Sequence, residues 1–295
     1  MRLNPYCMCC QLNKQEQRIR KFTDKEKKVA YMQEIMMRYA QATEDDCAPS
    51  LSVEFKEIYQ KYWHIPAEDY TEIKKEFNQL MMSLEEDLSR MIHQSPDPLE
   101  SALIYARIGN YIDFAAMSHV DKDVVLSMIR EEKKEPLDPE EYRRFCSELE
   151  KASSLVYLTD NCGEIVLDKI AVEILRKRYP DLKITVIVRG KPVINDATLE
   201  DARMCGLTKI ADVIGNGSGV GGTWLPDISE EARSLLEQAD VIISKGQGNF
   251  ETLHECGLNI YYLFLCKCDL FVRLFDADLF QGMFVNEKRV LLHEA

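Results

Sequence analysis

The feature that most constrains the fold is a repeated alternation of short apolar segments and amphipathic segments in the second half of the chain. We expect strands at residues 154–158, 183–188, 210–215, 241–244 and 260–265. We expect helices between them at residues 164–178, 199–205, 229–238 and 249–256. Strands that alternate with helices form a mostly parallel sheet covered by helices on both faces. This part of the chain is therefore predicted to be an α/β protein, a three-layer α/β/α sandwich with a Rossmann-like sheet.

The first half of the chain has a different pattern, because its apolar residues recur at helical spacing. Residues 24–92 are rich in Lys, Glu, Met and Leu, and breaks fall at Pro66 and at the Pro96–Pro98 segment. Residues 99–117 continue the helical pattern, and a charged connector follows at 131–139. We therefore predict an N-terminal helical domain over residues 1–135 and an α/β/α domain over residues 136–295, for which the residues described below predict metal binding and catalysis.

The charge and the cysteine content limit the partners and the compartment. A formal net charge of −13 repels nucleic-acid backbones and anionic lipid, so we expect neither nucleic acid nor a membrane surface as a partner. The longest apolar run, at 260–266, is too short to span a membrane. The start of the chain shows no secretory signal, so the ten cysteines are expected to be reduced, in a cytoplasmic protein.

Oxygen-bearing side chains follow the first two predicted strands. Asp160 and Asn161 come directly after the first strand, and Asp196 follows the second. In open α/β sheets, ligands bind beyond the carboxyl ends of the strands. Two carboxylates and an amide suit Mg²⁺ or Mn²⁺, with the remaining ligands supplied by water and substrate. Asp and Asn are also common helix caps, so capping by Asp160 and by the Asn195–Asp196 pair is the alternative.

Two glycine-containing segments follow later strands. Residues 244–251 place Lys245 between a buried strand and a helix, where an ammonium and backbone N–H groups can hold a phosphate. A glycine-rich turn with a solvated lysine is the alternative. Residues 216–224 are predicted to form a substrate loop or an ordinary surface loop. A dinucleotide site is excluded, because the next helix begins only near residue 229.

Two further groups of residues are candidates for a role in binding. Asn110 and Asp113 lie one helical turn apart in an apolar segment, so they either face an active site or face solvent. Four cysteines, in a C-x-x-C and a C-x-C arrangement, have the ligand number of a structural Zn²⁺ site. They are Cys7, Cys10, Cys266 and Cys268. Buried or bystander thiols are the alternative for this second metal site.

Four motifs resemble those of the damage-control phosphatase family, and the resemblance spans most of the chain. They read DNCGE at 160–164 with Asp168, RGKPVIND at 189–196, SKGQGNFE at 244–251 and GNYID at 109–113. The resemblance implies a metal-dependent phosphatase of phosphorylated metabolites, often sugar phosphates, with a helical part packed on an α/β/α sandwich. It implies metal ligands at Asp160, Asn161 and Asp196 and a phosphate contact at Lys245. The C-x-x-C looks like that of the family's prokaryotic branch.

The predicted reaction is hydrolysis of a phosphate monoester of a small metabolite. The cofactor is expected to be Mg²⁺ or Mn²⁺, with Co²⁺ and Ni²⁺ as further candidates. Lys245 is expected to stabilise the equatorial phosphoryl oxygens, and Glu164 or Asp113 to position a water. Direct attack by Asp160 stays open as an alternative. The expected substrate-binding residues are Asn110, Arg189, Asn195, Lys245, Gly246, Gly248 and Asn249.

Two other functions compete with this hypothesis. One is a carboxyl methyltransferase that uses S-adenosylmethionine, which a Rossmann-like pattern permits. Such an enzyme would want a glycine turn after the first strand, where this chain carries Asp160 and Asn161. The other is a metal- or metabolite-binding protein without catalysis.

Overall fold

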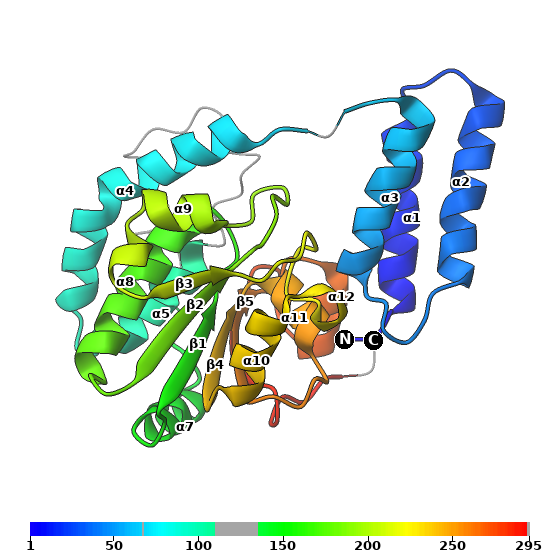
Figure 1. Ribbon diagram of the computed structural model, residues 1–295. Helices are drawn as coiled ribbons and strands as arrows, with labels where there is room; N and C mark the ends of the chain where they lie inside the picture. The colour runs from blue at the N-terminus through cyan, green and yellow to red at the C-terminus, as the bar shows by residue number, and fades with distance from the viewer. Residues whose placement is uncertain (67, 110–134, 294–295) are drawn as a thin grey trace.

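A six-stranded sheet lies at the centre of the computed structural model, which describes residues 1–66, 68–109 and 135–293. The strand order is β3-β2-β1-β4-β5-β6 (Figure 1). The strands are β1 (Ser154–Leu158), β2 (Lys183–Val188), β3 (Asp212–Gly215), β4 (Val241–Lys245), β5 (Ile260–Leu265) and β6 (Gly282–Asn286). Strands β1 to β5 pair in parallel, and β6 pairs antiparallel with β5. The sheet is thus mostly parallel, as expected.

Alternating side chains of the central strands enter two separate hydrophobic cores. In β1, Leu155 and Tyr157 belong to one core, whereas Val156 and Leu158 belong to the other. Strand β5 is buried along its full length, which is typical of a parallel strand covered on both faces. The two cores therefore lie on opposite faces of one sheet.

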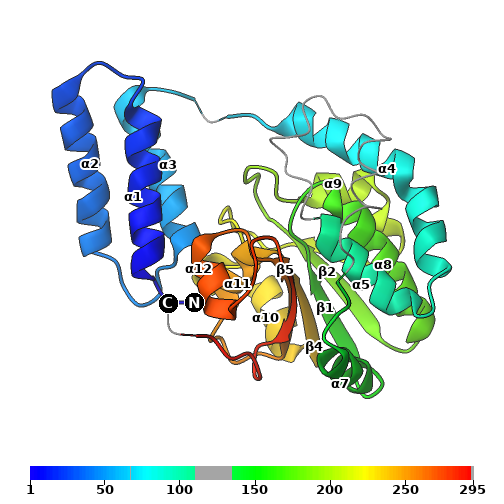
Figure 2. The same cartoon turned by 180° about the vertical axis from the view of Figure 1, so that it is seen from behind.

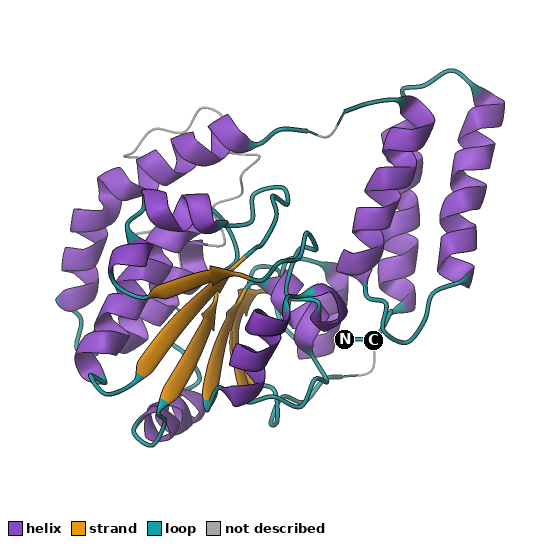
Figure 3. Ribbon diagram, viewed as in Figure 1, coloured by secondary structure: helices purple, strands orange, loops and turns teal. Residues whose placement is uncertain are grey.

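Helices cover both faces, which gives three layers (Figure 3). One face carries α4 (Thr71–His93), α5 (Pro98–Ile108), α7 (Pro139–Leu149), α8 (Glu164–Arg178) and α9 (Leu199–Met204). The opposite face carries α10 (Glu230–Gln238), α11 (Gln247–Leu253) and α12 (Asp269–Phe275). Two short 3-10 helices, η3 (Leu207–Lys209) and η4 (Leu225–Asp227), complete the connections. The expected α/β/α architecture is confirmed.

The first three helices form a bundle beside the sheet (Figures 1 and 2). They are α1 (Pro5–Ile19), α2 (Lys25–Ala40) and α3 (Ala48–Trp63). Their core is separate from the other two and is rich in aromatic residues such as Tyr31, Phe55 and Tyr59. The Met1 ammonium donates to the carbonyl oxygens of Glu251 (2.9 Å) and His254 (2.8 Å), which joins the start of the bundle to α11.

The hydrophobic cores do not divide at residue 135, where the sequence predicted a domain boundary. Helices α4 and α5 share one core with α8 and the sheet, because Phe77, Leu84 and Leu103 pack against its residues. The break between cores falls between α3 and α4 instead, where residues 64–66 and 68–70 form neither helix nor strand. Helical periodicity alone does not show which helix packs on which core.

Most expected elements are found within two residues of their predicted ends, but two elements near the C-terminus were not expected. They are α12 and β6. Both are short, at 7 and 5 residues, and β6 forms an edge of the sheet and is only partly buried. Their periodicity is accordingly weak.

None of the helices in the described part of the chain has both the length and the apolar character that a membrane span requires.

Candidate active site

The candidate site lies at the carboxyl ends of β1, β2 and β4, which we call the carboxyl edge. Strand β1 pairs with β2 on one side and with β4 on the other, so the chain connections leave it in opposite directions. Loops that diverge at such a point open a crevice beyond the strand ends. The ends of these three strands and the turns after them carry most of the predicted site residues.

Asp160, Asn161 and Asp196 are brought together at this edge. A backbone bridge pairs Asn161 with Asp196, and the Ala197 N–H donates to the Asp160 carbonyl oxygen at 2.8 Å. The Asn161 Nδ2 donates to Asp160 Oδ2 at 2.8 Å and to Glu164 Oε2 at 3.2 Å. The turn thus gathers carboxylates around one amide, as the sequence predicted from strand order.

Arg189 lies beside these carboxylates at the end of β2. Its Nε donates to Asp196 Oδ2 at 2.5 Å, and its Nη2 lies 3.7 Å from Asp160 Oδ1. The Arg189 side chain is 1% exposed, yet neither Nη1 nor Nη2 donates a hydrogen bond. Buried donors without acceptors are unfavourable, so these two groups are suited to an anionic ligand.

The ionisation of the cluster favours a bound cation. Burial and then the nearby Glu164 and Asp196 carboxylates raise the pKa of Asp160 from 3.8 to about 7. Burial also raises the pKa of Asp196, against the opposing effect of Arg189. No group of three or more His, Cys, Asp or Glu able to hold a metal occurs among the described residues, so Asn161 would have to be the third ligand. Two carboxylates and an amide fit a hard divalent cation.

Lys245 has no donor left for a phosphate, contrary to expectation. Its side chain is fully buried, and its Nζ donates to Ala106 O (2.8 Å), Glu164 Oε1 (2.5 Å) and Asp168 Oδ1 (2.7 Å). An ammonium has three N–H donors, and all three are used. The sequence could place Lys245 at a strand end but could not show that α5 and α8 cover it. Here the lysine joins α5 and α8 to β4.

Asn249 and its neighbouring glycines shape the site through the backbone. The Asn249 Nδ2 donates to the Thr159 and Lys245 carbonyl oxygens, and its Oδ1 accepts from Thr223 Oγ1 at 2.8 Å. The Asn249 side chain is therefore used to join loops. A Cβ on Gly246 would lie 2.0 Å from Asp160 Oδ2, and one on Gly248 would lie 3.3 Å from the Gly221 carbonyl oxygen. Asn249, Gly246 and Gly248 were expected to bind substrate, and their contacts in the structure instead position the loops of the site.

Helix α4 supplies two polar residues that the sequence analysis did not single out. Lys74 Nζ donates to the Asp196 carbonyl oxygen at 2.7 Å and pairs with Asp201 at 2.8 Å. Asn78 accepts from the Gly163 N–H at 2.6 Å and donates to Asp201 Oδ1 at 2.7 Å. Both side chains support the turns that carry the cluster. The sequence could have indicated them, because Lys74 and Asn78 are two polar residues, four positions apart, on a helix face that also carries the apolar Phe77.

Of the remaining predicted site residues, those that the structure describes do not lie with Asp160, Asn161 and Asp196 as direct ligands. Glu164 is buried at the start of α8 and bonds to Asn161 and Lys245, so it lies behind the cluster. The Asn195 carbonyl oxygen accepts from the Cys162 N–H at 2.8 Å. Asn110 and Asp113 lie outside the described residues.

The four-cysteine metal site is not assembled in the described structure. All four thiols are free, and no metal-binding group of three or more His, Cys, Asp or Glu is found among the described residues. Cys266 is buried in the core beneath α12, whereas Cys7, Cys10 and Cys268 line a cleft beside α1. The described structure therefore does not bring the four thiols together, because Cys266 is buried in the core, which spacing in the sequence did not show.

Comparison with known proteins reveals similarity along nearly the whole chain. Residues 3–281 match the family model of the damage-control phosphatase ARMT1-like domain. A damage-control phosphatase from Archaeoglobus fulgidus is 30% identical over 274 residues, covering 91% of this chain and 93% of the relative. A damage-control phosphatase from Pyrococcus horikoshii is 36% identical over 176 residues, covering 59% of this chain and 60% of the relative.

The fold is also found among solved structures. The crystal structure of a DUF89 family protein from Pyrococcus horikoshii matches with a TM-score of 0.79 at 26% identity. The match covers 97% of this chain and 99% of that chain, so it includes both the helical bundle and the α/β part.

Proposed function

Since the chain belongs to the damage-control phosphatase ARMT1-like domain family, which makes it a phosphatase, we propose that it hydrolyses phosphate monoesters of small metabolites in a divalent-metal-dependent reaction. Sugar phosphates are the first substrates to test. The observation that carries the proposal is the buried Arg189, with two nitrogens free of hydrogen bonds beside Asp160 and Asp196.

The proposed metal ligands are Asp160, Asn161 and Asp196. A bound Mg²⁺ or Mn²⁺ would neutralise phosphoryl charge and lower the pKa of a water molecule. The raised pKa values of Asp160 and Asp196 support this assignment, because a cation relieves the mutual repulsion of buried carboxylates. The same aspartates also fix the loops through backbone contacts, so structural and ligand roles are compatible.

The chain's own residues have distinct roles in this proposal. Arg189 binds the transferred phosphoryl oxygens through Nη1 and Nη2, while its Nε stays on Asp196. The Asp160 side chain is 13% exposed and can contact the reacting group. Glu164 and Lys245 are fully buried and act as positioning residues, because Glu164 accepts from both Asn161 and Lys245.

The test is turnover of p-nitrophenyl phosphate and a panel of sugar phosphates with Mg²⁺, Mn²⁺, Co²⁺ or Ni²⁺, each with and without a chelator. We expect metal-dependent activity that falls at least about 100-fold in Asp160→Asn, since that variant loses a carboxylate at the metal. Asp212→Asn is the matched control, because Asp212 is exposed at the start of β3, at the opposite end of the sheet. Equal activity of Asp160→Asn and wild type would overturn the assignment.

The same protein preparation tests the two competing functions. Calorimetric binding of S-adenosylmethionine in the presence of chelator would support the methyltransferase. Metal binding without turnover across the whole panel would support a binding protein. We expect neither result.

A further inference from the structure

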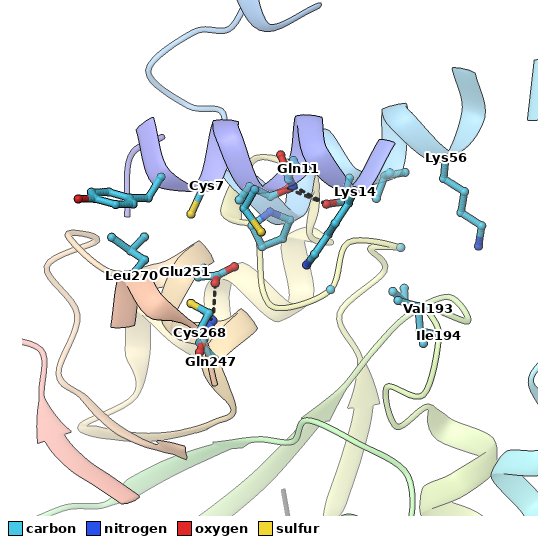
Figure 4. A pocket seen from close by; sticks show the side chains of 18 of the residues that line it. Cys7, Gln11, Lys14, Lys56, Val193, Ile194, Gln247, Glu251, Cys268 and Leu270 are labelled. Atoms are coloured by element: carbon cyan, nitrogen blue, oxygen red, sulfur yellow. Dashed lines mark hydrogen bonds between the residues drawn. The ribbon is translucent and has the colours of Figure 1, made fainter. Parts of the chain in front are cut away.

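A cleft of about 850 Å³ separates the helical bundle from the carboxyl edge of the sheet (Figure 4). Helices α1 and α3 form one wall of this cleft. The opposite wall comprises residues 192–194, Gly219, Gly221 and the start of α11 and α12. A volume of several hundred Å³ is typical of sites that bind small molecules. The cleft therefore has room for a metabolite.

The opposite wall is built from the same turns that carry the candidate active site. The Val193 carbonyl oxygen accepts from the Asp196 N–H at 2.8 Å. Gln247, which also lines the cleft, follows Gly246, whose backbone packs against Asp160. A molecule held in the cleft thus lies next to the acidic cluster, although the cleft lining itself does not include Asp160 or Asp196.

Two lysines from different helices project into this cleft. Figure 4 shows Lys14 of α1 and Lys56 of α3 on the side of the cleft that faces Val193 and Ile194. Neither lysine forms an ion pair or a side-chain hydrogen bond with another described residue. In a chain with a net charge of −13, two cationic side chains without a hydrogen-bonded partner in one cleft favour an anionic ligand.

Three acidic groups also line the cleft, and one of them interacts with Lys14. They are Glu57 on α3, Glu251 on α11 and Asp269 on α12. Glu251 accepts from Gln247 at 2.8 Å and lies beside Cys268 and Leu270 in Figure 4, away from Lys56. Burial raises the pKa of Glu251, but it is close enough to Lys14 for their charges to attract, which acts to lower that pKa. The positive charge is thus greatest at the end of the cleft that carries Lys56, and Lys14 lies between Lys56 and Glu251.

We propose that the preferred substrate carries a second anionic group, a carboxylate or a further phosphate, which Lys14 and Lys56 bind while the scissile phosphate lies at Arg189. This inference rests on the proposed phosphatase function and specifies its substrate class. The bundle then acts as a specificity element, because both lysines come from it and the reacting groups come from the sheet.

The test compares pairs of sugar phosphates in which one member carries a second anion. Glucose 6-phosphate is paired with 6-phosphogluconate, and fructose 6-phosphate with fructose 1,6-bisphosphate. The fructose pair keeps the same sugar, whereas the glucose pair also changes from a ring to an open chain. We expect wild-type kcat/KM to be at least about tenfold higher for the doubly anionic member, and this ratio to fall toward one in the Lys14→Gln/Lys56→Gln variant. Lys61→Gln is the matched control, because Lys61 also lies on α3 but pairs with Glu34 at 2.8 Å.

Calorimetric binding of the same four compounds separates this inference from the proposed function. A wild type that shows no preference, or a double variant that keeps the wild-type ratio, would overturn the second-anion site even if turnover is high. If neither these compounds nor p-nitrophenyl phosphate and the wider panel are hydrolysed, the proposed function fails, and the ratio of dissociation constants between wild type and double variant still decides this inference. Thermal unfolding of the double variant confirms that it is folded.

Discussion

At the scale of single residues, Arg189 combines a buried guanidinium with N–H groups that have no hydrogen-bond acceptor, although buried donors usually have one. Its guanidinium is almost completely buried, and only its Nε donates a hydrogen bond, to Asp196. Each unsatisfied buried donor costs about 1–3 kcal/mol. A planar guanidinium can keep one bond to a carboxylate while its two terminal nitrogens bind a phosphoryl group. The unfavourable free state therefore increases the gain in free energy when an anion binds.

This arrangement predicts that Arg189→Lys is not a conservative substitution. A lysine keeps the positive charge but cannot pair with Asp196 and bind two phosphoryl oxygens with fixed geometry. We expect KM for p-nitrophenyl phosphate to rise about tenfold or more, with a further fall in kcat. Arg178→Lys is the control, because Arg178 forms a partly exposed pair with Asp97 at 3.1 Å. Unchanged kinetics in Arg189→Lys would exclude Arg189 from phosphate binding.

At the scale of elements, the turn between β4 and α11 depends on a glycine. Gly246 has a φ of 81°, in a region that side-chain-bearing residues rarely adopt. A Cβ there would also lie 2.0 Å from Asp160 Oδ2. The turn after β4 therefore fixes the position of a carboxylate that belongs to the turn after β1, so two strands of the sheet define one site.

The pair Gly246→Ala and Gly257→Ala tests this coupling. Gly257 has a φ of 79°, but nothing lies within 4 Å of its Cβ position. Both variants place an alanine at a positive φ, which costs about 1 kcal/mol or more, and Gly246 also has a ψ of 156°, a combination that is almost confined to glycine. Only Gly246→Ala should displace Asp160, so we expect at least about a tenfold loss of kcat in that variant and near wild-type kcat in Gly257→Ala. Equal kcat values in the two variants would contradict the coupling.

The elements themselves were predicted well where their periodicity was strong. Strands β1, β2 and β5 and helix α8 begin and end where expected, because each is a buried segment with a clear turn beside it. The edge strand β6 and the short helix α12 were not predicted. The grouping of α4 and α5 with the sheet was not visible either, since an amphipathic helix does not specify its partner.

At the scale of the whole molecule, the buried acidic cluster makes stability depend on pH. Burial and neighbouring carboxylates raise the pKa of Asp160 from 3.8 to about 7 in the folded protein. Its contribution to stability is therefore present in full below its unfolded pKa and is lost as the pH rises through about 7. At alkaline pH, the metal-free protein should therefore have a lower free energy of unfolding than a variant that lacks this charge.

We expect the Tm of metal-free Asp160→Asn to exceed that of the wild type by several degrees at pH 8 and by much less at pH 5. One kcal/mol shifts Tm by about 2 °C in a chain of this size. Adding Mg²⁺ or Mn²⁺ should stabilise the wild type and not the variant. Thermal scans in chelator and in metal measure both effects, with Asp212→Asn as control. A Tm difference that is the same at both pH values would contradict the assigned ionisation.

The site residues were predicted in part, and the failures have a common physical origin. Asp160, Asn161 and Asp196 could be brought together in advance, because parallel strands end at one edge of a sheet. Lys245 was placed at the correct edge, but its three hydrogen bonds to α5 and α8 were not visible. Lys74 and Asn78 were missed because α4 is distant in sequence from the loops it supports.

The sequence by itself determined the α/β architecture, the order of the polar turns and the chemistry of their side chains, since these follow from periodicity and residue type. Only the tertiary structure decided which charged groups are satisfied within the protein and which remain for a ligand. Lys245 is enclosed by acceptors, whereas Arg189 keeps two free nitrogens. That difference depends on packing between segments far apart in the chain, which local sequence patterns do not encode.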